Sequence, residues 1–201
     1  MTNTKQQIME EAFLLFLKRG FKAVRVSDIE QAAQITRGTF YYHFSGKEEV
    51  LKEGIRTYYA LLNTQRLEEF ERSSTLREYI DLTIWKVLSV DHYTPLVFNA
   101  KIPEILCLSL MVEVMALFPE LKKVIMEAKM LRLSKLEQLI HYAQSVGELH
   151  NDLDISILAK NLLNISAGII NYIMVHQNVT TALAAVRDQY EQLYALAAVK
   201  A

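Results

Sequence analysis

Cysteine, proline and glycine are scarce in this sequence: one, three and six residues of these types occur among 201. The single cysteine, Cys107, excludes an intramolecular disulfide and favours a reducing compartment, with the thiol in the core. So few prolines and glycines argue against a loop-rich β architecture, and a hydrophobic fraction of 51% excludes a disordered chain. We therefore expect an all-α protein with a substantial core.

Long uncharged hydrophobic runs are also absent, because acidic or polar residues interrupt every apolar stretch before it reaches membrane-spanning length. The N-terminus MTNTKQQIMEE is too polar for a signal peptide, so a cytoplasmic protein without membrane contact is expected. Residues up to Ala60 carry a formal charge of +2 and the remainder −3, within a net charge of −1. This asymmetry is too mild to establish nucleic-acid binding by itself.

Helical periodicity and breakers predict about nine helices. Gly20 is the expected C-cap of the first helix, and Ser27 with Glu30 forms an expected capping box at the second. Gln34 and Ile35 form a turn before Thr36, the expected N-cap of the third. The predicted ranges are about 4–19, 27–33, 36–44, 47–70, 75–90, 101–117, 119–146, 155–177 and 180–199.

The segment ITRGTFYYHFSGKEEV, from Ile35 to Val50, is the most informative part of the chain. Phe40 and Phe44 lie four residues apart and face inward, while the other positions are polar or aromatic and face outward. Two short helices joined by a tight turn form a helix-turn-helix, whose second helix enters the major groove of DNA. The predicted DNA-binding residues are Thr36, Arg37, Gly38, Thr39, Tyr41, Tyr42, His43 and Lys47.

These residues divide into two predicted roles. Arg37 can donate to both acceptors of a guanine, and Thr39 can contact a thymine methyl. The other polar side chains, including Lys47 as a point charge, are expected to bind phosphates. The alternative for Tyr42 and His43 is packing within the small domain.

The stretch from Gly20 to Ile55 resembles the N-terminal DNA-binding domain of the TetR family of transcriptional repressors. The resemblance implies a three-helix DNA-binding domain at 1–46 and a larger helical ligand-binding and dimerisation domain at 47–201. It also implies the same DNA contacts, a homodimer and an effector pocket. Gln34 stands where the family usually has a turn glycine, so we expect a left-handed backbone at a non-glycine residue.

The C-terminal part supplies large or adaptable side chains suited to a pocket for a small, largely apolar effector. For each of them core packing is the alternative. The predicted lining residues are Tyr58, Trp85, Phe98, Met111, Met115, Met130 and Tyr172. Apolar content in the last two helices predicts that the homodimer forms there.

No arrangement of nucleophile, base and orienting residue occurs, so we do not expect an enzyme or a cofactor. His141, His150, Asp152 and Asp154 are acceptable metal ligands, but a solvated polar loop is the favoured interpretation and no metal site is predicted. The resemblance thus predicts a transcriptional repressor that leaves operator DNA when a small-molecule effector binds. The alternative is a helical interaction or ligand-binding protein whose helix-turn-helix no longer reads DNA.

Overall fold

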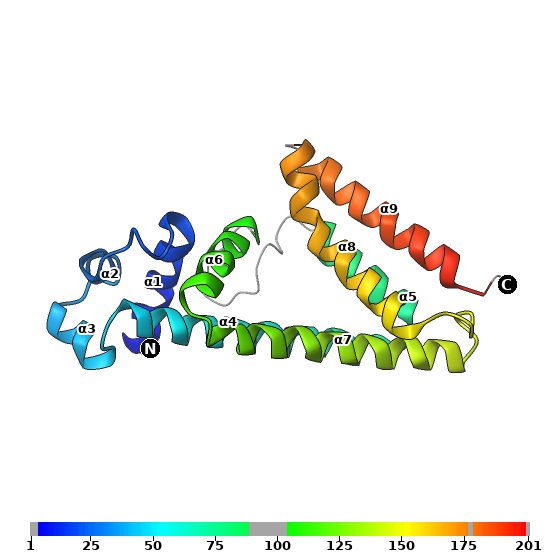
Figure 1. Ribbon diagram of the computed structural model, residues 1–201, viewed down its shortest axis with the longest axis horizontal. Coiled ribbons are helices and arrows are strands. Elements are labelled where there is room, and N and C mark those ends of the chain that lie inside the picture. The colour runs from blue at the N-terminus through cyan, green and yellow to red at the C-terminus, as the bar shows by residue number, and fades with distance from the viewer. Residues whose placement is uncertain (1–3, 89–103, 177–178, 200–201) are drawn as a thin grey trace. The chain divides into compact units, whose positions relative to one another are not determined.

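A computed structural model of the chain describes residues 4–88, 104–176 and 179–199 (Figure 1). These residues form α-helices and no strand, which confirms the all-α prediction. The chain divides into two compact units, which we describe separately: unit 1 contains Met1–Leu62 and Thr94–Ala128, and unit 2 contains Asn63–Tyr93 and Lys129–Ala201. Unit 1 is thus larger than the predicted DNA-binding domain at 1–46, whose status as a functional domain stays a prediction.

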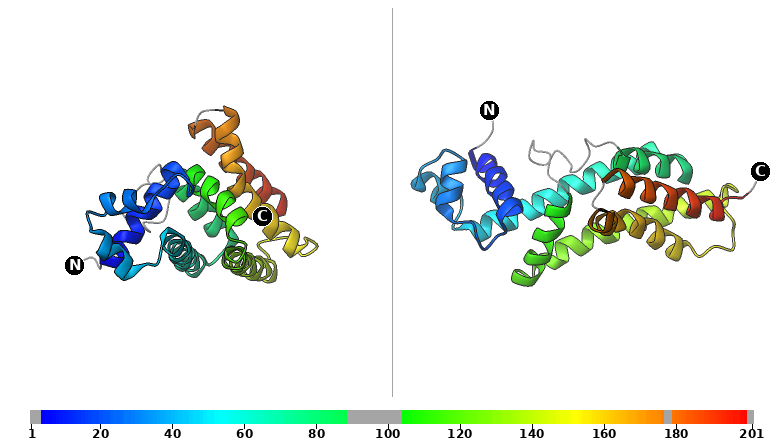
Figure 2. Two further views of the ribbon diagram at one scale, coloured as in Figure 1. Left: turned by 60° about the vertical axis from the view of Figure 1, so that its left-hand side comes forward. Right: turned by 90° about the horizontal axis from the view of Figure 1, so that it is seen from above.

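Unit 1 places the predicted helix-turn-helix on a supporting core. Its helices are α1 (Thr4–Arg19), α2 (Val26–Ala32), α3 (Arg37–His43), the first part of α4 (Lys47–Arg72), α6 (Glu104–Leu117) and the start of α7 (Leu121–Ser145). Both views in Figure 2 show α1, α2 and α3 gathered around one another. One continuous hydrophobic cluster joins these three helices to α4, α6 and α7, so α6 and α7 share the core that holds α3, the predicted reading helix, in place.

The first helix has the predicted bounds and ends at Gly20, whose φ of 77° is the left-handed conformation expected at a C-cap. Its apolar face is buried through Ile8, Ala12 and Phe16. Because those positions recur every three or four residues, one stripe of α1 faces the cluster.

The second helix begins one residue before the predicted start, and the predicted capping box of Ser27 and Glu30 is wrong. Arg25 is the N-cap, and its backbone N–H donates to the Asp28 carboxylate at 2.7 Å. Ile29 then occupies the fully buried position of this short helix. The same spacing of three residues therefore operates, shifted toward the N-terminus by two.

The end of α2 confirms the expected backbone at Gln34, which has a φ of 53°. The N–H of Ile35 donates to the carbonyl of Glu30 at 3.0 Å, and that of Gln34 donates to Gln31 at 3.3 Å. This pair of bonds is a Schellman motif, with Gln34 at the position that glycine usually occupies. The motif turns the chain sharply from α2 into α3.

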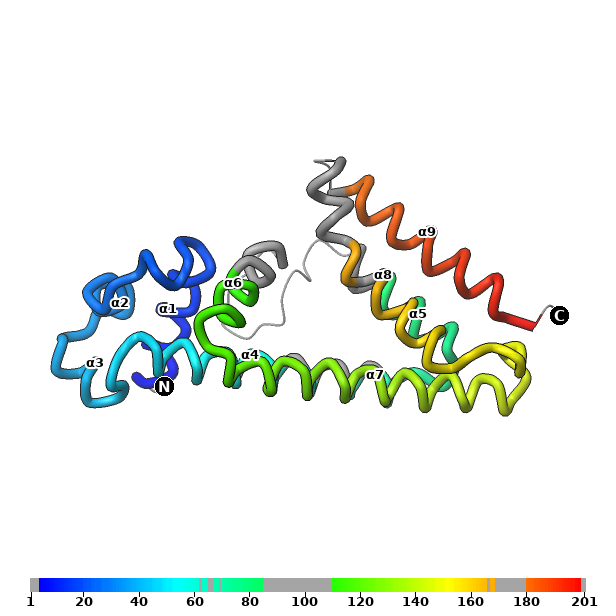
Figure 3. Tube along the Cα trace, in the orientation of Figure 1, coloured from blue at the N-terminus to red at the C-terminus, as the bar shows by residue number. Residues whose placement is uncertain are grey.

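Unit 2 contains the rest of α4 and α7 together with α5 (Leu76–Leu88), α8 (Ile155–His176) and α9 (Val179–Ala197). Helices α8 and α9 pack against each other as a hairpin (Figure 3). The Tyr190 hydroxyl, buried in this hairpin, donates to the carbonyl of Leu162 at 3.0 Å. None of the described helices is long and apolar enough to span a membrane.

Glu148, directly after the left-handed Gly147, joins three parts of unit 2. Its carboxylate accepts the backbone N–H groups of Leu76 and Arg77 at 3.1 and 2.9 Å, and the Tyr194 hydroxyl at 3.0 Å. It therefore caps the N-terminus of α5, where an anion is favoured. Burial, followed by this hydrogen bond, raises the pKa of Tyr194 to about 12.

Arg77 continues the same polar network. Its guanidinium donates two hydrogen bonds to Glu191 on α9, at 2.6 and 2.8 Å, and also pairs with Asp81 one turn along α5. The hydrogen bonds from Arg77 lower the pKa of the Glu191 carboxyl. The first turn of α5 is thus fixed to α9 by charge-assisted bonds.

Candidate nucleic-acid interface

The predicted reading helix, α3, begins as the sequence indicates. Thr36 is its N-cap, and the side-chain oxygen accepts the backbone N–H of Thr39 at 3.2 Å. On the inward side, Phe40 and Phe44 are buried and their ring centres lie 6.2 Å apart. A helix of only seven residues is not stable alone, so this cap and these two rings determine its position.

The opposite side of α3 presents polar and aromatic groups to solvent. Arg37 and Gly38 are exposed, and Tyr41 and Tyr42 are 46% and 84% exposed. Such exposure is unusual for large aromatic side chains, and it places two phenolic hydroxyls where phosphates could bind them. The structure therefore brings these four predicted residues together on one surface.

Two ring contacts order this surface. The Arg37 guanidinium lies 5.6 Å from the centre of the Tyr41 ring, one helical turn away, and the Tyr42 and His43 rings meet edge to face at 4.9 Å. A cation held over an aromatic face loses fewer rotamers when its planar fork binds an acceptor pair. Thr39 is less available, because it is half-buried and its hydroxyl lies 2.9 Å from that of Thr36.

Lys47, predicted to bind a phosphate, has a different local environment. Its ammonium donates to the carbonyls of Phe21, Lys22 and Val24, and it lies 4.4 Å from the centre of the Phe21 ring. These acceptors belong to the loop between α1 and α2. Lys47 is therefore engaged within the chain, unlike Arg37.

Two exposed bases near α2, Lys22 and Arg25, were not among the predicted site residues. Arg25 is the N-cap residue of α2, and Lys22 lies in the loop before it. Basic side chains beside a helix N-terminus suit phosphate binding. Their position just before the helix-turn-helix was the available signal.

The predicted effector-binding residues are not brought together by the described part of the chain. Tyr58 and Met111 pack in or against the core of unit 1, whereas Met115 in unit 1 and Met130 in unit 2 are exposed. Phe98 and the side chains of Trp85 and Tyr172 lie outside the described residues. The pocket assignment accordingly stays a prediction.

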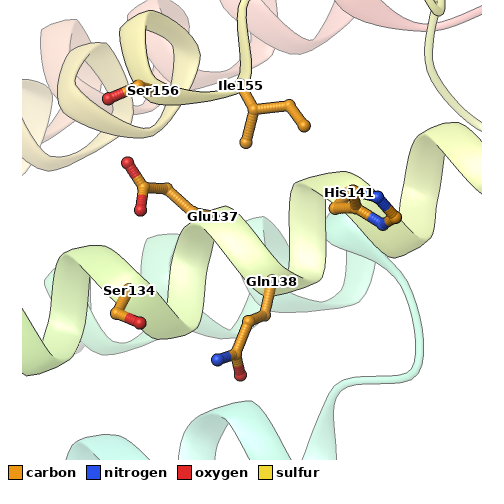
Figure 4. A pocket seen from close by; sticks show the side chains of 6 residues that line it. All are labelled: Ser134, Glu137, Gln138, His141, Ile155 and Ser156. Atoms are coloured by element: carbon orange, nitrogen blue, oxygen red, sulfur yellow. The ribbon is translucent and has the colours of Figure 1, made fainter.

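Unit 2 contains an open groove of about 480 Å³ between α7 and α8 (Figure 4). Its lining includes none of the predicted effector residues. The lining residues are Ser134, Glu137, Gln138, His141, Ile155 and Ser156. Within the described ranges, no cluster of three or more histidine, cysteine or acidic side chains is suited to a metal ion.

Sequence comparison identifies this helix-turn-helix. Residues 8–53 match the profile described as "Bacterial regulatory proteins, tetR family". The N-terminal segment of the chain belongs to the tetR family. The predicted resemblance is thereby confirmed, and a family of regulatory proteins agrees with the prediction that the chain is not an enzyme.

Similar curated proteins match only part of this chain. The regulator TtgR of Pseudomonas putida is 31% identical over 49% of this chain and 45% of its own length. QacR of Staphylococcus aureus is 30% identical over 47% of this chain and 50% of its own. The TetC protein of transposon Tn10 from Escherichia coli is 37% identical over 24% of this chain and 25% of its own. The chain thus spans between a quarter and a half of these relatives.

Solved structures match nearly the whole chain in fold. A regulator from Cytophaga hutchinsonii superposes with a TM-score of 0.79 at 20% identity, covering 98% of this chain and 96% of that one. Reduced NemR of E. coli superposes with a TM-score of 0.78 at 17% identity over the full length of both. At such low identity these likenesses establish the fold alone.

Proposed function

We propose that this protein is a DNA-binding transcriptional regulator that represses genes as a homodimer and is released from its operator by a small-molecule effector. The observation that carries the proposal is the exposed face of α3, where Arg37, Gly38, Tyr41 and Tyr42 gather above two buried phenylalanines. The cationic group of Arg37 suits a guanine edge, and the phenols suit phosphates. Thr36, Thr39 and His43 complete the proposed contacts.

The absence of a side chain at Gly38 supports a close approach of α3 to a nucleic acid. A Cβ at this residue would meet only the Thr36 hydroxyl, at 3.8 Å, so internal packing does not require glycine there. Glycine instead leaves the exposed surface of the first turn flat. Backbone and base edges can then approach one another without a methyl group between them.

The homodimer is proposed to form through α8 and α9. Ile157 on α8 and Leu196 on α9 are 58% and 67% exposed, which is high for aliphatic side chains. A two-fold dimer would present two copies of α3 to successive major grooves. An effector bound in the C-terminal part would weaken DNA binding by the same factor by which DNA weakens effector binding.

Selection from random duplex DNA tests the proposal. The full chain is expected to enrich a two-fold symmetric sequence with half-sites about one helical turn apart, and sedimentation should show a dimer. A second selection with added cell extract should recover less DNA if an effector is present. Recovery of no enriched sequence at low salt would favour the alternative, a helical protein that no longer reads DNA.

A further inference from the structure

The loop from Gly20 to Arg25 connects α1 to the helix-turn-helix, and α6 holds its backbone N–H groups. The Glu113 carboxylate accepts the N–H of Phe21 at 2.8 Å and that of Lys22 at 3.3 Å. Gly20 eases this approach, because a Cβ there would lie 3.3 Å from the same carboxylate, closer than an ordinary van der Waals contact. Glu113 therefore binds a turn 91 and 92 residues earlier in the sequence.

The carbonyl groups of the same loop are bound from α4. Lys47 Nζ donates to Phe21 at 3.0 Å, to Val24 at 2.6 Å and to Lys22 at 3.4 Å. A lysine ammonium has three N–H donors, so three carbonyl acceptors satisfy it. Both kinds of backbone polar group in this loop are thus bound, the donors by an anion and the acceptors by a cation.

The buried side chain of Phe21 makes the position of the loop matter for α3. Its ring centre lies 5.3 Å from both Phe16 and Phe118, so it is packed between α1 and the end of α6. The loop leads directly into α2, and the Schellman turn at Gln34 links α2 to α3. A displacement of the loop would therefore be transmitted to the reading helix by short, rigid elements.

We propose that Lys47 and Glu113 are positioning residues for the reading helix, and that Lys47 acts on the chain's own backbone and not on a DNA phosphate. The proposal rests on the proposed DNA-binding function and specifies how the site is held. To bind a phosphate, the Lys47 ammonium would have to break its charge-assisted hydrogen bonds to three backbone carbonyls. Those carbonyls would then lack this donor, and the lost bonds oppose the exchange. Arg37 has no such intramolecular carbonyl contacts among the described residues.

The salt dependence of DNA binding distinguishes positioning from phosphate contact. Each lost phosphate contact makes the negative slope of log K against log salt concentration less steep by about 0.9, whereas misplacement of α3 lowers affinity without removing a contact. Lys47→Met is therefore expected to weaken binding to the selected DNA about tenfold or more while the slope stays that of wild type. A slope for Lys47→Met that is less steep than that of wild type by about 0.9 for each protomer would overturn the proposal.

Lys52→Met is the matched control on the same helix. Lys52 also lies near a phenylalanine ring, that of Phe118, but its ion-pair partner is the Glu120 side chain at 2.7 Å. It holds no loop carbonyl in the described contacts. Its substitution should leave both the affinity for selected DNA and the slope near wild type, and an effect equal to that of Lys47→Met would contradict the assignment.

Amide hydrogen exchange tests Glu113 without DNA. Glu113→Ala should speed exchange at Phe21 and Lys22 about tenfold or more, since each N–H loses a hydrogen bond to a charged acceptor. Glu113→Gln, which keeps one acceptor oxygen, should protect these amides partly, and Glu120→Ala should change neither. Unchanged exchange at both amides, or equal acceleration throughout the protein, would overturn the positioning role.

The two experiments separate this proposal from the proposed function. If wild-type protein binds no DNA but Glu113→Ala accelerates exchange at Phe21 and Lys22, then Glu113 does hold the loop, but the proposed role of that contact in DNA reading is wrong. If wild type binds selected DNA and neither variant weakens binding, then DNA reading stands and the positioning role fails.

Discussion

Gly54 on α4 lies so close to α1 that a Cβ at residue 54 would be 2.9 Å from Cδ2 of Phe13. Glycine within a helix normally costs about 1 kcal/mol relative to alanine. At this position the close approach makes alanine less stable than glycine, because the added methyl group would have to displace the buried ring of Phe13. We predict that Gly54→Ala lowers the free energy of unfolding by about 1–3 kcal/mol, the usual range for overpacking.

Urea denaturation measures this effect, and Gly38→Ala is the matched control. The nearest heavy atom to a Cβ at Gly38 is 3.8 Å away, so that variant should equal or slightly exceed wild type in stability. If Gly54→Ala were the more stable of the two, the packing of α4 against α1 would be looser than described.

Gln34→Gly should stabilise the protein. The residue has a φ of 53°, and a non-glycine side chain in the left-handed region costs about 1–2 kcal/mol. Part of that gain is lost through the greater freedom of glycine in the unfolded chain, so a net increase of about 1 kcal/mol or less in unfolding free energy is expected. Gln34→Ala, which keeps a Cβ, should show no comparable gain in the same thermal or urea unfolding experiment.

Thr36→Ala should destabilise α3 by removing its N-cap. The lost hydrogen bond to the Thr39 N–H corresponds to about 1 kcal/mol in unfolding free energy. Thr36→Ser keeps the capping oxygen and should lie within a few tenths of wild type. Equal stability of the alanine and serine variants would show that Phe40 and Phe44 alone fix the helix.

Arg37→Ala should weaken binding to selected DNA by about 1–3 kcal/mol and relax preference at one base pair. The matched variant Arg37→Lys keeps the charge but loses the planar fork. It should retain binding to random DNA while losing discrimination at that position. Competition binding with single-base variants of the selected sequence measures both effects, and an unchanged preference in both variants would exclude Arg37 as a base-reading residue.

Tyr194 predicts a change in stability at alkaline pH. Burial and the bond to Glu148 raise its pKa from 10.0 to about 12, so the folded state favours the protonated phenol. Its contribution is complete below pH 10 and is lost as pH rises through 12. The difference in unfolding free energy between wild type and Tyr194→Phe should therefore shrink over that window, whereas a constant difference would show that the hydroxyl does not titrate in this environment.

The local features of the N-terminal helices were predictable from sequence because neighbouring residues determine them. The bounds of α1, the cap at Thr36 and the left-handed Gln34 all depend on apolar spacing or on residues within one turn. The predicted cap of α2 was wrong because Ser27 and Glu30 are the residue types that usually form a capping box, whereas arginine is rarely an N-cap residue. Arg25 contributes its backbone N–H, which no preference for side chains reveals.

Long-range contacts were not predictable in the same way. Lys47 has the spacing of a phosphate-binding residue, and only the folded chain shows the loop carbonyls around its ammonium. Glu113 carried one sequence signal, since it is the only charged residue between Ile105 and Leu117. A carboxylate within such an apolar helix requires a partner, but the partner lies in a loop more than 90 residues away.

The division of α3 into two faces has a consequence for how such a regulator can change over evolutionary time. Fold stability depends on Phe40 and Phe44, while Tyr42 is 84% exposed and contributes almost nothing to the core. If α3 reads DNA as proposed, substitutions on its outer face can therefore alter the preferred sequence without lowering the free energy of unfolding. The proposed operator preference and the stability of the fold then depend on different residues of this helix, so one outward residue at a time could change without unfolding the domain.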